Sequence, residues 1–574
     1  MSSIWQMKVN YNHMKNKIII LMVLASVFTS CEHLEYSEAS YYSDSDQIFD
    51  ASSLAPNWLN NIYSYLPTDF NSIGGTMRSC ASDDAENVWQ SSAVQRLNNG
   101  AWGPSNPLDA QWSNNYKAIR AANFFMKEFD IAKFDDRKLL PGSTYEEEFE
   151  RWQYHLAEAR CLRAFFYFDL AKRYGGVPLV GDELLDREEA NKLTKSTFDE
   201  VITYLVGECD LAAQNLPLSY EGVSNVPPTG KVTKGTALAI KARALLYAAS
   251  PLHNPTGDNN KWIAAAAAAK EVMDLGIYSL ADFSVVVNDR SAANTELIFE
   301  RRTGNSNSFE RANFPIGYEG GNTGLCPSQN LVDAFQTRNG YDVTLEASGN
   351  WVSDDPTFDA ANPYDNRDPR FAATILYNGA SFKGMDVESF IGGKNGSDLE
   401  GGTLTGYYLK KYIFEDIGFA PNSPVKNREH VWVLYRFAEI ILNYAEAMNE
   451  AYGPNGLGGD FTMTASQAIN MLRVTRGMPV ITTSNVVEFR EKLINERRVE
   501  LAFEDHRYWD IRRWKIGEET KTVHGVKITK QSDGTLTYAP TVVDERLWED
   551  KMYLYPFPYD ETIINENLLQ NTGW

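Results

Sequence analysis

The sequence lacks most of the short motifs that mark enzymes and metal-binding proteins. Its 574 residues include only 5 cysteines and 7 histidines. No C-x-x-C or H-E-x-x-H pattern occurs, so neither a zinc ribbon, a redox dithiol nor a zinc hydrolase is indicated. The G-x-S-x-G turn of α/β-hydrolases is also absent. Gly230-Lys231-Val232 lacks the upstream glycine and the following Ser or Thr of a phosphate loop.

Basic residues are scarce relative to acidic ones. There are 54 Lys and Arg residues against 76 Asp and Glu residues, which gives a formal net charge of −22. Nucleic-acid binding needs basic side chains gathered on one face, so this balance argues against nucleic acid as a partner. The chain also holds 13 Trp, 30 Tyr and 28 Phe residues. A disordered tail protein could not bury so many apolar side chains and is excluded.

Long hydrophobic runs are absent except for one near the start of the chain. Residues 18–28 (IIILMVLASVF) follow Lys15 and Lys17 and precede small residues, which is the arrangement of a secretory signal. The run is shorter than the ~20 apolar residues that cross a bilayer comfortably. We therefore expect residues 1–30 to be a signal peptide, and Met14, just before the basic pair, offers an alternative start.

Cys31 directly follows the predicted signal. The sequence Phe28-Thr29-Ser30-Cys31 resembles a relaxed lipobox of bacterial lipoproteins, in which the cysteine sulfur carries the lipid. The alternative is an ordinary signal peptide with an incidental cysteine. Removing residues 1–30 leaves 51 basic and 76 acidic residues, a net charge of −25. We expect acyl chains on Cys31 to anchor the protein and residues 31–50, which are polar and acidic, to form a flexible tether.

The other four cysteines are widely spaced at Cys80, Cys161, Cys209 and Cys326. In an exported protein they could form two disulfides. Cys161 and Cys209 fall in segments with helical periodicity, where buried free thiols are the better interpretation.

Two blocks of the sequence show the periodicity of amphipathic helices. In the first block, Leu162, Phe166 and Leu170 recur at helical spacing, and six consecutive alanines at 264–269 add a strong helix former. The pattern returns in the second block. The predicted helices are residues 114–128, 154–174, 197–213, 234–249, 433–448, 465–476 and 487–503. Helix pairs of this length suggest tetratricopeptide-like stacking, although no clear 34-residue repeat is present.

A loop-rich region separates the two helical blocks. It is rich in Gly, Asn, Ser and Asp, with short strand-like runs such as residues 372–377. We therefore expect one mostly α domain over residues 51–574. Its helical frame should comprise about residues 51–275 and 431–514. The irregular, ligand-facing part should comprise about residues 276–430 and 515–574, because binding residues concentrate on loops held by a rigid scaffold.

Several acidic residues share helix faces. Glu439 and Glu446 lie on one predicted face, and Glu496, Glu500 and Glu504 form an i, i+4, i+8 stripe. A glycosidase needs two carboxylates roughly 5–9.5 Å apart around its substrate. Charge-matched packing explains these acids better, because arginines interleave with the stripe. Those arginines are Arg497, Arg498, Arg507, Arg512 and Arg513.

We accordingly predict no catalytic residues and no cofactor. Asp44-Ser45-Asp46 lacks the glycine and the terminal Glu of a calcium loop, so only a bound structural cation remains open at this point.

Aromatic residues beside amides and acids stand out in the loop-like segments. The run Asp83-Asp84-Ala85-Glu86-Asn87-Val88-Trp89 is polar and has no helical periodicity. Indole and phenol rings stack on the C–H faces of sugars, while Asn, Asp and Arg hydrogen-bond to sugar hydroxyls. We therefore predict a glycan-binding site with Trp89 foremost. The candidate residues are Trp89, Asn87, Asp84, Trp102, Tyr318 and Trp351. Trp112, Trp152 and Trp432 are instead assigned to packing.

Several stretches, in a fixed order along the chain, form a recognisable set. They are residues 114–123, 157–164, 168–170, 174–179, 235–246, 435–449, 495–514, 554–558 and 571–574. Together they resemble the SusD/RagB family, outer-membrane glycan-binding lipoproteins of Bacteroidetes. The chain ends in Trp574, where Tyr is commoner in the family.

The resemblance implies a tetratricopeptide-like helical frame with an irregular, ligand-facing half. It also implies a lipid-anchored position at the cell surface, capping a SusC-like TonB-dependent transporter that imports oligosaccharides. Glu32 and Glu35 resemble the surface-export signal of these lipoproteins. Glu496 and Arg497 belong to the structural part of the family pattern, and no family motif transfers a site role to Trp89 or Tyr318.

The leading hypothesis is therefore a protein that binds glycan without catalysis and delivers it to the transporter. Two alternatives stay open. One is a glycoside hydrolase. The other is an adaptor whose helical groove grips a peptide or the transporter itself. A family variant that captures peptides in place of sugars is intermediate between these hypotheses.

Overall fold

The computed structural model describes residues 48–574, except for 51, 53, 224, 225, 228, 290, 292 and 293. The predicted signal peptide, Cys31, the Asp44–Asp46 segment and most of the tether lie outside the described residues and stay predictions. Over the described residues, no helix is both long enough and apolar enough to cross a bilayer.

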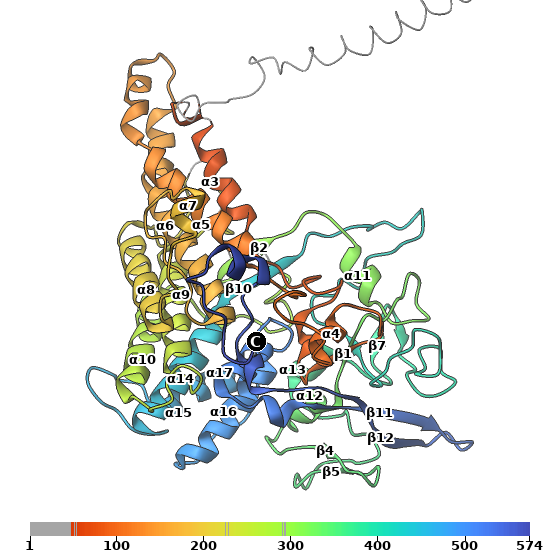
Figure 1. Ribbon diagram of the computed structural model, residues 1–574. Coiled ribbons are helices and arrows are strands. Elements are labelled where there is room, and N and C mark those ends of the chain that lie inside the picture. Colours follow the sequence, from red (N-terminus) through yellow and green to blue (C-terminus); the bar gives the residue numbers. More distant parts are fainter. Residues whose placement is uncertain are drawn as a thin grey trace, which may run out of the picture.

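The chain folds into a helical frame and an irregular half that lie side by side, as Figure 1 shows. The molecule is mostly α-helical, as the sequence predicts. The long helices are α3 (Ala55–Ser64), α5 (Trp112–Glu128), α6 (Tyr145–Tyr174), α8 (Phe198–Asn215), α9 (Lys234–Ala249), α10 (Asn259–Met273), α14 (Phe437–Tyr452), α15 (Ala465–Thr475), α16 (Val486–Glu500) and α17 (Arg507–Trp514). Shorter helical turns are η1 (Arg78–Ala81), α4 (Val94–Asn98), η2 (Ile131–Leu139), α7 (Arg187–Ala190), α11 (Ser308–Asn313), α12 (Gln329–Ala334), α13 (Pro369–Thr374), η3 (Gly517–Thr520), η4 (Asp550–Tyr553) and α18 (Tyr559–Ile564).

Neighbouring helices of the frame pack in series. Contacts join α5 to α6, α6 to α8, α8 to α9, α9 to α10, α10 to α14 and α14 to α15. This is the helix-pair stacking that the sequence predicts for the frame. Trp112, Trp152 and Trp432 are buried, which confirms the packing role assigned to them.

Threonine caps fix where several of the helices begin. Thr197, Thr233 and Thr464 each accept a hydrogen bond from the backbone N–H three residues later, and the residue at that position bonds back to the cap in all three. Such reciprocal capping satisfies two of the free N–H groups at a helix start.

Thr197→Ala should lower the free energy of unfolding by about 1 kcal/mol, because the first turn of α8 loses its cap. In the wild-type protein, the Glu200 N–H donates to Thr197 Oγ1 at 3.2 Å and the Thr197 N–H donates to Glu200 Oε2 at 2.7 Å. Urea titration followed by circular dichroism measures the loss. Thr203→Ala, in the middle of the same helix and exposed, is the control, and an equal loss in the two variants would contradict the capping role.

The short strands pair in two-stranded antiparallel sheets. Over the described residues, the pairs are β1 (Ala85–Asn87) with β3 (Leu325–Pro327), β2 (Leu297–Arg302) with β10 (Val431–Arg436), β4 (Thr344–Leu345) with β5 (Trp351–Val352), β6 (Ile375–Leu376) with β9 (Tyr408–Leu409), β7 (Ser381–Phe382) with β8 (Met385–Asp386), and β11 (Thr522–Lys530) with β12 (Leu536–Glu545). The β11–β12 hairpin projects from the body in Figure 1.

Two segments differ from the sequence prediction. Val433 lies in β10 and not in a helix, because all six residues of VWVLYR are buried and all but Leu434 pair with β2, and α14 begins only at Phe437. Of residues 372–377, the first three end helix α13 and only Ile375 and Leu376 form a strand, β6. Pro369 occupies the first turn of α13 and the Asp368 side chain accepts from the Arg370 N–H, which are strong helix-start signals.

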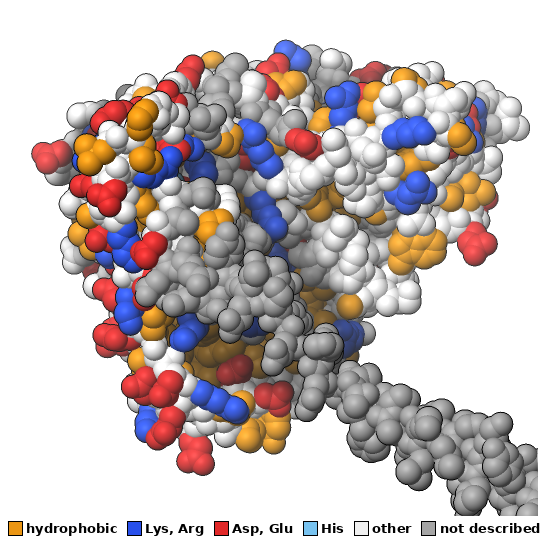
Figure 2. All heavy atoms as spheres, turned by 90° about the horizontal axis from the view of Figure 1, so that it is seen from above, with side chains coloured by type: hydrophobic (Ala, Val, Ile, Leu, Met, Phe, Trp, Pro, Cys, Tyr) orange, Lys and Arg blue, Asp and Glu red, His pale blue; other side chains and the backbone are white. Residues whose placement is uncertain are grey.

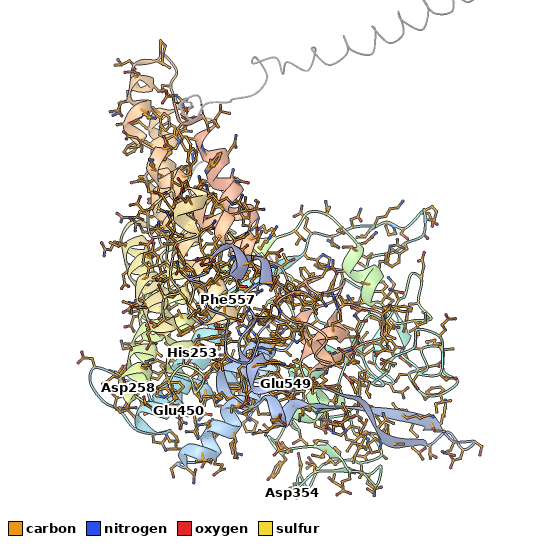
Figure 3. The ribbon with its side chains drawn as sticks, viewed as in Figure 1. His253, Asp258, Asp354, Glu450, Glu549 and Phe557 are labelled. Atoms are coloured by element: carbon orange, nitrogen blue, oxygen red, sulfur yellow. The ribbon has the colours of Figure 1, made fainter. Side chains whose placement is uncertain are left out.

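The C-terminal segment returns to the helical frame, which the sequence did not predict. The Tyr555 N–H donates to the Arg173 carbonyl at 2.7 Å. The ring of Phe557, labelled in Figure 3, stacks on Tyr174 with centroids 5.5 Å apart. The indole of Trp574 packs against Trp102 at 4.6 Å. Of residues 515–574, therefore, only the β11–β12 hairpin and the loops near it belong to the irregular part.

The four cysteines of the described residues are free and buried. Cys161 lies on α6 and Cys209 on α8, as the interpretation of buried thiols expects. Burial raises the pKa of the Cys326 thiol to about 11, so this group stays protonated and unreactive at neutral pH.

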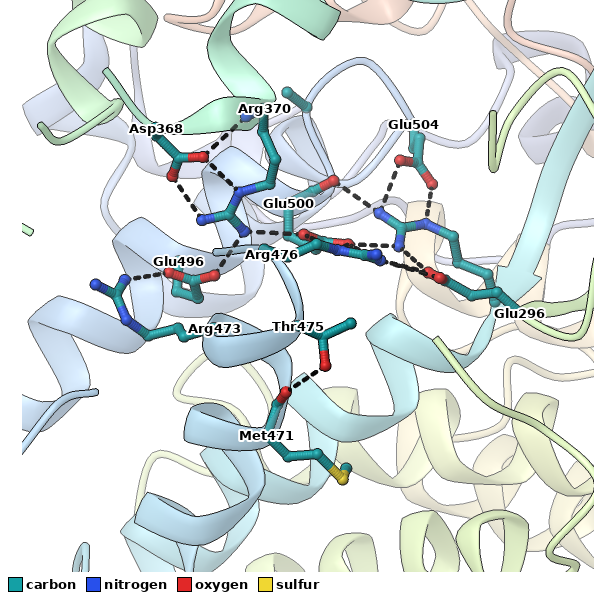
Figure 4. A network of polar contacts seen from close by, with 12 residues as sticks. Glu296, Asp368, Arg370, Met471, Arg473, Thr475, Arg476, Glu496, Glu500 and Glu504 are labelled. Carbon is teal, nitrogen blue, oxygen red and sulfur yellow. Dashed lines mark hydrogen bonds and ion pairs between the residues drawn. The ribbon is translucent and has the colours of Figure 1, made fainter. Parts of the chain in front are cut away.

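A buried ionic network lies where α15 and α16 meet β2, β10 and α13 (Figure 4). Glu500 accepts from three arginines: Arg370 at 2.8 Å, Arg436 at 2.7 Å and Arg476 at 2.8 Å. Burial alone would raise the pKa of Glu500, but the three guanidinium groups hold that pKa well below its usual value. The same arginines also pair with Glu296, Asp368, Glu496 and Glu504.

The remaining acids of the predicted stripes are likewise paired with arginine. Glu439 binds Arg243 at 2.5 Å, and Glu446 binds Arg513 at 2.5 Å. Glu496 binds Arg370 at 2.6 Å. These contacts confirm that the acids pack against arginines. The partners differ from the arginines interleaved in the sequence, however, because among those five only Arg513 pairs with one of these acids.

Glu158 on α6 forms a second buried cluster, which ties α6 to α3. Its carboxylate accepts from the Tyr63 hydroxyl at 2.6 Å, lies 3.1 Å from His155 Nδ1 and pairs with Lys231 at 3.3 Å. Burial would raise its pKa, but Lys231, His155 and the Tyr63 hydrogen bond lower it to about 2.

Glu158→Gln should lower the free energy of unfolding by about 2 kcal/mol near pH 7, because charged hydrogen bonds are lost. The folded-state pKa is depressed, so the carboxylate stabilises the protein above its unfolded pKa of about 4.3, and this contribution disappears as pH falls toward 2. The difference between wild type and variant should therefore shrink from pH 5 downward in urea titrations. Glu150→Gln, exposed on the same helix, is the control. A difference that stays constant down to pH 3 would contradict the assignment.

Candidate functional site

Trp89 presents a large exposed aromatic ring in the irregular half, where β1 and α4 also lie, although the sequence predicts residues 51–275 to be part of the helical frame. Its side chain is 41% exposed. The indole Nε1 donates to the Asn322 carbonyl at 3.2 Å, which fixes the orientation of the ring. Gly401 lies against the edge of the ring, where an added Cβ would come within 3.4 Å of Cη2. The ring is therefore held in place on one side and open to solvent on the other.

A tight turn presents this ring. The Trp89 N–H donates to Asn87 Oδ1 at 2.9 Å, and the Gln90 side chain donates to the Asn87 carbonyl at 2.9 Å. An asparagine that bonds the backbone two residues on mimics a turn and fixes its geometry. Asn87 is buried and acts on the backbone of the turn.

Arginines from distant parts of the chain anchor the segment that leads to this turn. Asp83 pairs with Arg507 at 2.8 Å and with Arg498 at 3.0 Å, and Asp84 pairs with Arg498 at 2.7 Å. Glu86 pairs with Arg546 at 3.0 Å. Burial would raise the pKa of Asp83, but Arg498 and Arg507 lower it. The acids of the DDAEN run therefore hold the segment in place, and Asp84 is not exposed to solvent.

Two further loops complete the support of the ring. The Val88 N–H donates to the Gly324 carbonyl at 2.9 Å, next to the β1–β3 pair. The Thr323 hydroxyl donates to the Gly401 carbonyl. We call residues 88–92, 322–324 and 399–404 the Trp89 platform. Its exposed side chains include Gln90, Asn322, Leu399, Glu400 and Leu404.

The three other aromatic candidates do not reach this platform. Trp102 is 6% exposed and packs against Tyr555 and Trp574. Tyr318 is buried edge-on to Phe382 at 5.0 Å, and its hydroxyl donates to the Met385 carbonyl at 3.2 Å. Trp351 is buried between Tyr364 and Tyr538, with centroids 5.6 and 5.8 Å away.

A sugar stacks only on an exposed ring face, so these three buried rings serve packing in this structure. Their burial could not be predicted from their loop-like sequences, because the irregular half has a core of its own. Conversely, Asn322, Leu399 and Leu404 were not among the candidates predicted from the sequence. The one available signal was the glycine-rich run at 392–402, which allows the close approach of backbone to ring.

Two other hollows lie away from the platform. A groove of about 790 Å³ runs between α12, residues 336–344 and α16; its lining is mostly polar and charged and includes no aromatic ring. Burial raises the pKa of Asp333 on its wall to about 6. A smaller hollow of about 320 Å³ lies on the frame between α5, residues 178–193 and the C-terminal segment, over Trp112 and Tyr116.

The charge on the molecular surface differs between the two halves. Figure 2 looks down on the molecule and shows acidic and basic side chains crowded over the helical frame on the left. The irregular half on the right shows mostly uncharged surface. Within the described part of the chain, no three His, Cys, Asp or Glu side chains gather as metal ligands.

Family models match most of the chain. Residues 295–574 match the model described as the SusD family, and residues 32–246 match the model described as starch-binding associating with outer membrane.

Individual relatives are similar over nearly their full length. SusD-like protein P2 of Formosa agariphila is 23% identical over 97% of this chain and 99% of its own. A SusD-like protein of Bacteroides fragilis has 29% identity and a TM-score of 0.75, over 92% of this chain and 98% of its own. A SusD-like carbohydrate-binding protein of the same species has 25% identity and a TM-score of 0.69, over 91% of this chain and 100% of its own.

The architecture and these similarities show that the protein has the SusD-like fold, in which a helical frame carries an irregular half. More particularly, the chain belongs to the SusD/RagB family, as the resemblance of its motifs indicates.

Proposed function

We propose that this protein captures glycan without catalysis at the cell surface and delivers it to a SusC-like TonB-dependent transporter in the outer membrane. The observation that carries the proposal is the Trp89 platform, an exposed indole held rigidly on three loops of the irregular half. An aromatic ring in this state stacks on the C–H face of a sugar without first having to become ordered.

The surroundings of the ring suit a neutral, hydroxyl-rich ligand. Asn322 and Gln90 offer exposed amide groups that both donate and accept hydrogen bonds. A related SusD-like protein of Bacteroides fragilis, described as carbohydrate-binding, shares this fold. We assign the first sugar-binding position to Trp89, with Asn87 and Asp84 supporting it from below.

The pairing of the buried acids favours capture over hydrolysis. A hydrolase needs one free carboxylic acid and one free carboxylate facing a cleft. The acids of the two predicted stripes are instead bound to arginines inside the protein.

Native gel electrophoresis through immobilised polysaccharides tests the proposal. We expect the purified protein to be retarded by at least one glycan of a broad panel, with no new reducing ends after long incubation. Release of reducing ends would establish the hydrolase alternative. Binding of peptides with no retardation by any glycan would establish the peptide-binding alternative.

The lipid anchor and the transporter are tested separately. Mass spectrometry of the protein from membranes should find acyl chains on Cys31, and Cys31→Ala should release the protein into the soluble fraction. A SusC-like transporter should co-purify with the native protein. Co-purification without affinity for any glycan or peptide would favour the adaptor alternative.

A further inference from the structure

Two leucines protrude from the end of the helical frame. Leu139 is 84% exposed and Leu140 is 57% exposed. They lie at the end of η2, where the chain turns through Pro141 and Gly142 into α6, and Gly142 has a positive φ of 72°. In Figure 1 this turn lies at the upper end of the helical frame. We call residues 139–142 the leucine tip.

The leucines are not needed for the packing of η2. Phe134 of the same turn is buried and packs against Phe129 at 6.0 Å and Trp152 at 4.8 Å. The Tyr145 hydroxyl donates to Asp135 Oδ1 at 2.7 Å, and Arg137 binds Glu148. The interior face of η2 is therefore packed and hydrogen-bonded. These contacts fix the position of the tip, and its apolar side chains lie in solvent.

The first described residues of the chain, which follow Cys31 in the sequence, contact this same element. Phe49 is buried against Trp58 and Phe124. Asp50 pairs with Lys133 of η2 at 3.1 Å, and Arg137 of η2 donates to the Ser52 hydroxyl. Cys31 precedes Ile48 by 17 positions, a reach of at most about 60 Å. An anchor on Cys31 is therefore joined to the body beside η2, although a tether of this length does not by itself fix which face of the body meets the membrane.

We propose that the leucine tip is a second, non-covalent membrane contact, which inserts Leu139 and Leu140 into the lipid surface beside the anchor. The inference rests on the proposed lipidation of Cys31. The acyl chain alone leaves the body free to rotate on its tether. A second contact at η2 fixes which face of the protein meets the membrane, and stable attachment generally takes two such signals.

The chemistry of the tip favours lipid over a protein partner. Two leucines on a turn offer far less area than the roughly 1,200–2,000 Å² that a specific protein interface buries. They match the few apolar side chains that enter a lipid surface. Exposed acidic residues around the tip, namely Asp135, Asp136, Glu146 and Glu147, outnumber the exposed lysines Lys133 and Lys138, which pair with Asp50 and Asp135. The preferred surface is therefore neutral, and anionic lipid should weaken the contact.

Hydrogen exchange on vesicle-attached protein tests this proposal. The mature chain from Cys31 onward is coupled through that thiol to a maleimide lipid in phosphatidylcholine vesicles, which the four buried cysteines permit. Amides of residues 137–145 should exchange about tenfold more slowly than in the uncoupled chain, since insertion suppresses local opening. Residues 531–535, in the turn of the β11–β12 hairpin, should be unaffected and serve as the internal control.

Variants separate the apolar contact from the covalent link. Leu139→Ser with Leu140→Ser should abolish the protection, while Leu139→Ile with Leu140→Ile should retain it. Without coupling, each serine should lower vesicle binding about tenfold, the value of one buried leucine. Twenty per cent anionic lipid should reduce the protection.

Several outcomes would overturn the proposal. One is unchanged exchange at the tip in coupled wild-type protein; another is equal protection in the serine variant. Protection that occurs only in membranes containing the transporter would point to a protein partner and reject the lipid contact. The vesicle experiment attaches Cys31 by maleimide chemistry, so it does not depend on lipidation in cells. A failure to find acyl chains on Cys31 in cells would therefore refute the proposed lipid anchor, and the exchange experiment would still test the membrane contact of the leucine tip.

Discussion

Glu500→Gln is expected to lower the free energy of unfolding by about 3–5 kcal/mol, the largest loss of stability predicted for this protein. Glu500 is fully buried and accepts hydrogen bonds from Arg370, Arg436 and Arg476. Its removal leaves three guanidinium groups short of one negative charge in a region that is buried away from solvent. The loss arises mainly from these uncompensated charges and only secondarily from the missing contacts.

Urea titration followed by tryptophan fluorescence measures this effect. Glu488→Gln is the matched control, because Glu488 lies on the same helix and makes only exposed contacts, a hydrogen bond from the Thr483 hydroxyl at 2.6 Å and a loose pair with Lys492 at 3.8 Å. Its loss should stay below about 1 kcal/mol. If the two variants lose similar stability, the network contributes no more than a surface pair, and the structural role given to it is wrong.

Trp89→Ala should weaken glycan retention about 10- to 100-fold, because stacking on one aromatic ring contributes about 1–3 kcal/mol, as measured for nucleic-acid bases. The free energy of unfolding should change little, since the ring is exposed and its one hydrogen bond goes to a carbonyl that water can also satisfy. Trp89→Phe should retain part of the affinity through its smaller ring.

Tyr559→Ala provides the matched control for this substitution. Tyr559 is also a half-exposed aromatic residue, but it lies on α18, apart from the platform. Affinity electrophoresis against the glycan identified for the wild-type protein should show unchanged migration of Tyr559→Ala relative to wild type. Retention of Trp89→Ala at the wild-type level would remove the platform from the binding site while leaving the family assignment intact.

The helical frame could be predicted from the sequence because its signals are local. Periodic apolar residues such as Leu162 and Phe166, together with caps such as Thr197, act within one or two turns of the same helix. The exceptions came from long-range pairing. The segment at Val433 reads as helical by periodicity, but its neighbour in space is β2, more than 100 residues earlier.

The candidate site was predictable only in part, for the same reason. Trp89 was identified because its own neighbours are polar. The burial of Trp102 depends on Trp574, at the far end of the chain. Asp84 was placed among ligand-facing groups, but Arg498, more than 400 positions away, turns it inward. No local pattern carries such information.

The arginine anchors beneath the platform have a consequence for how binding specificity can change. Arg498 and Arg507 extend from the helical region and form salt bridges with Asp83 and Asp84. The segment that leads to the ring is therefore fixed directly to the frame. The turn at 88–92 is therefore an exposed segment that follows a firmly anchored one. Its residues can be exchanged for those of another binder while the salt bridges stay intact, which makes this turn the natural place to graft new sugar specificities onto the scaffold.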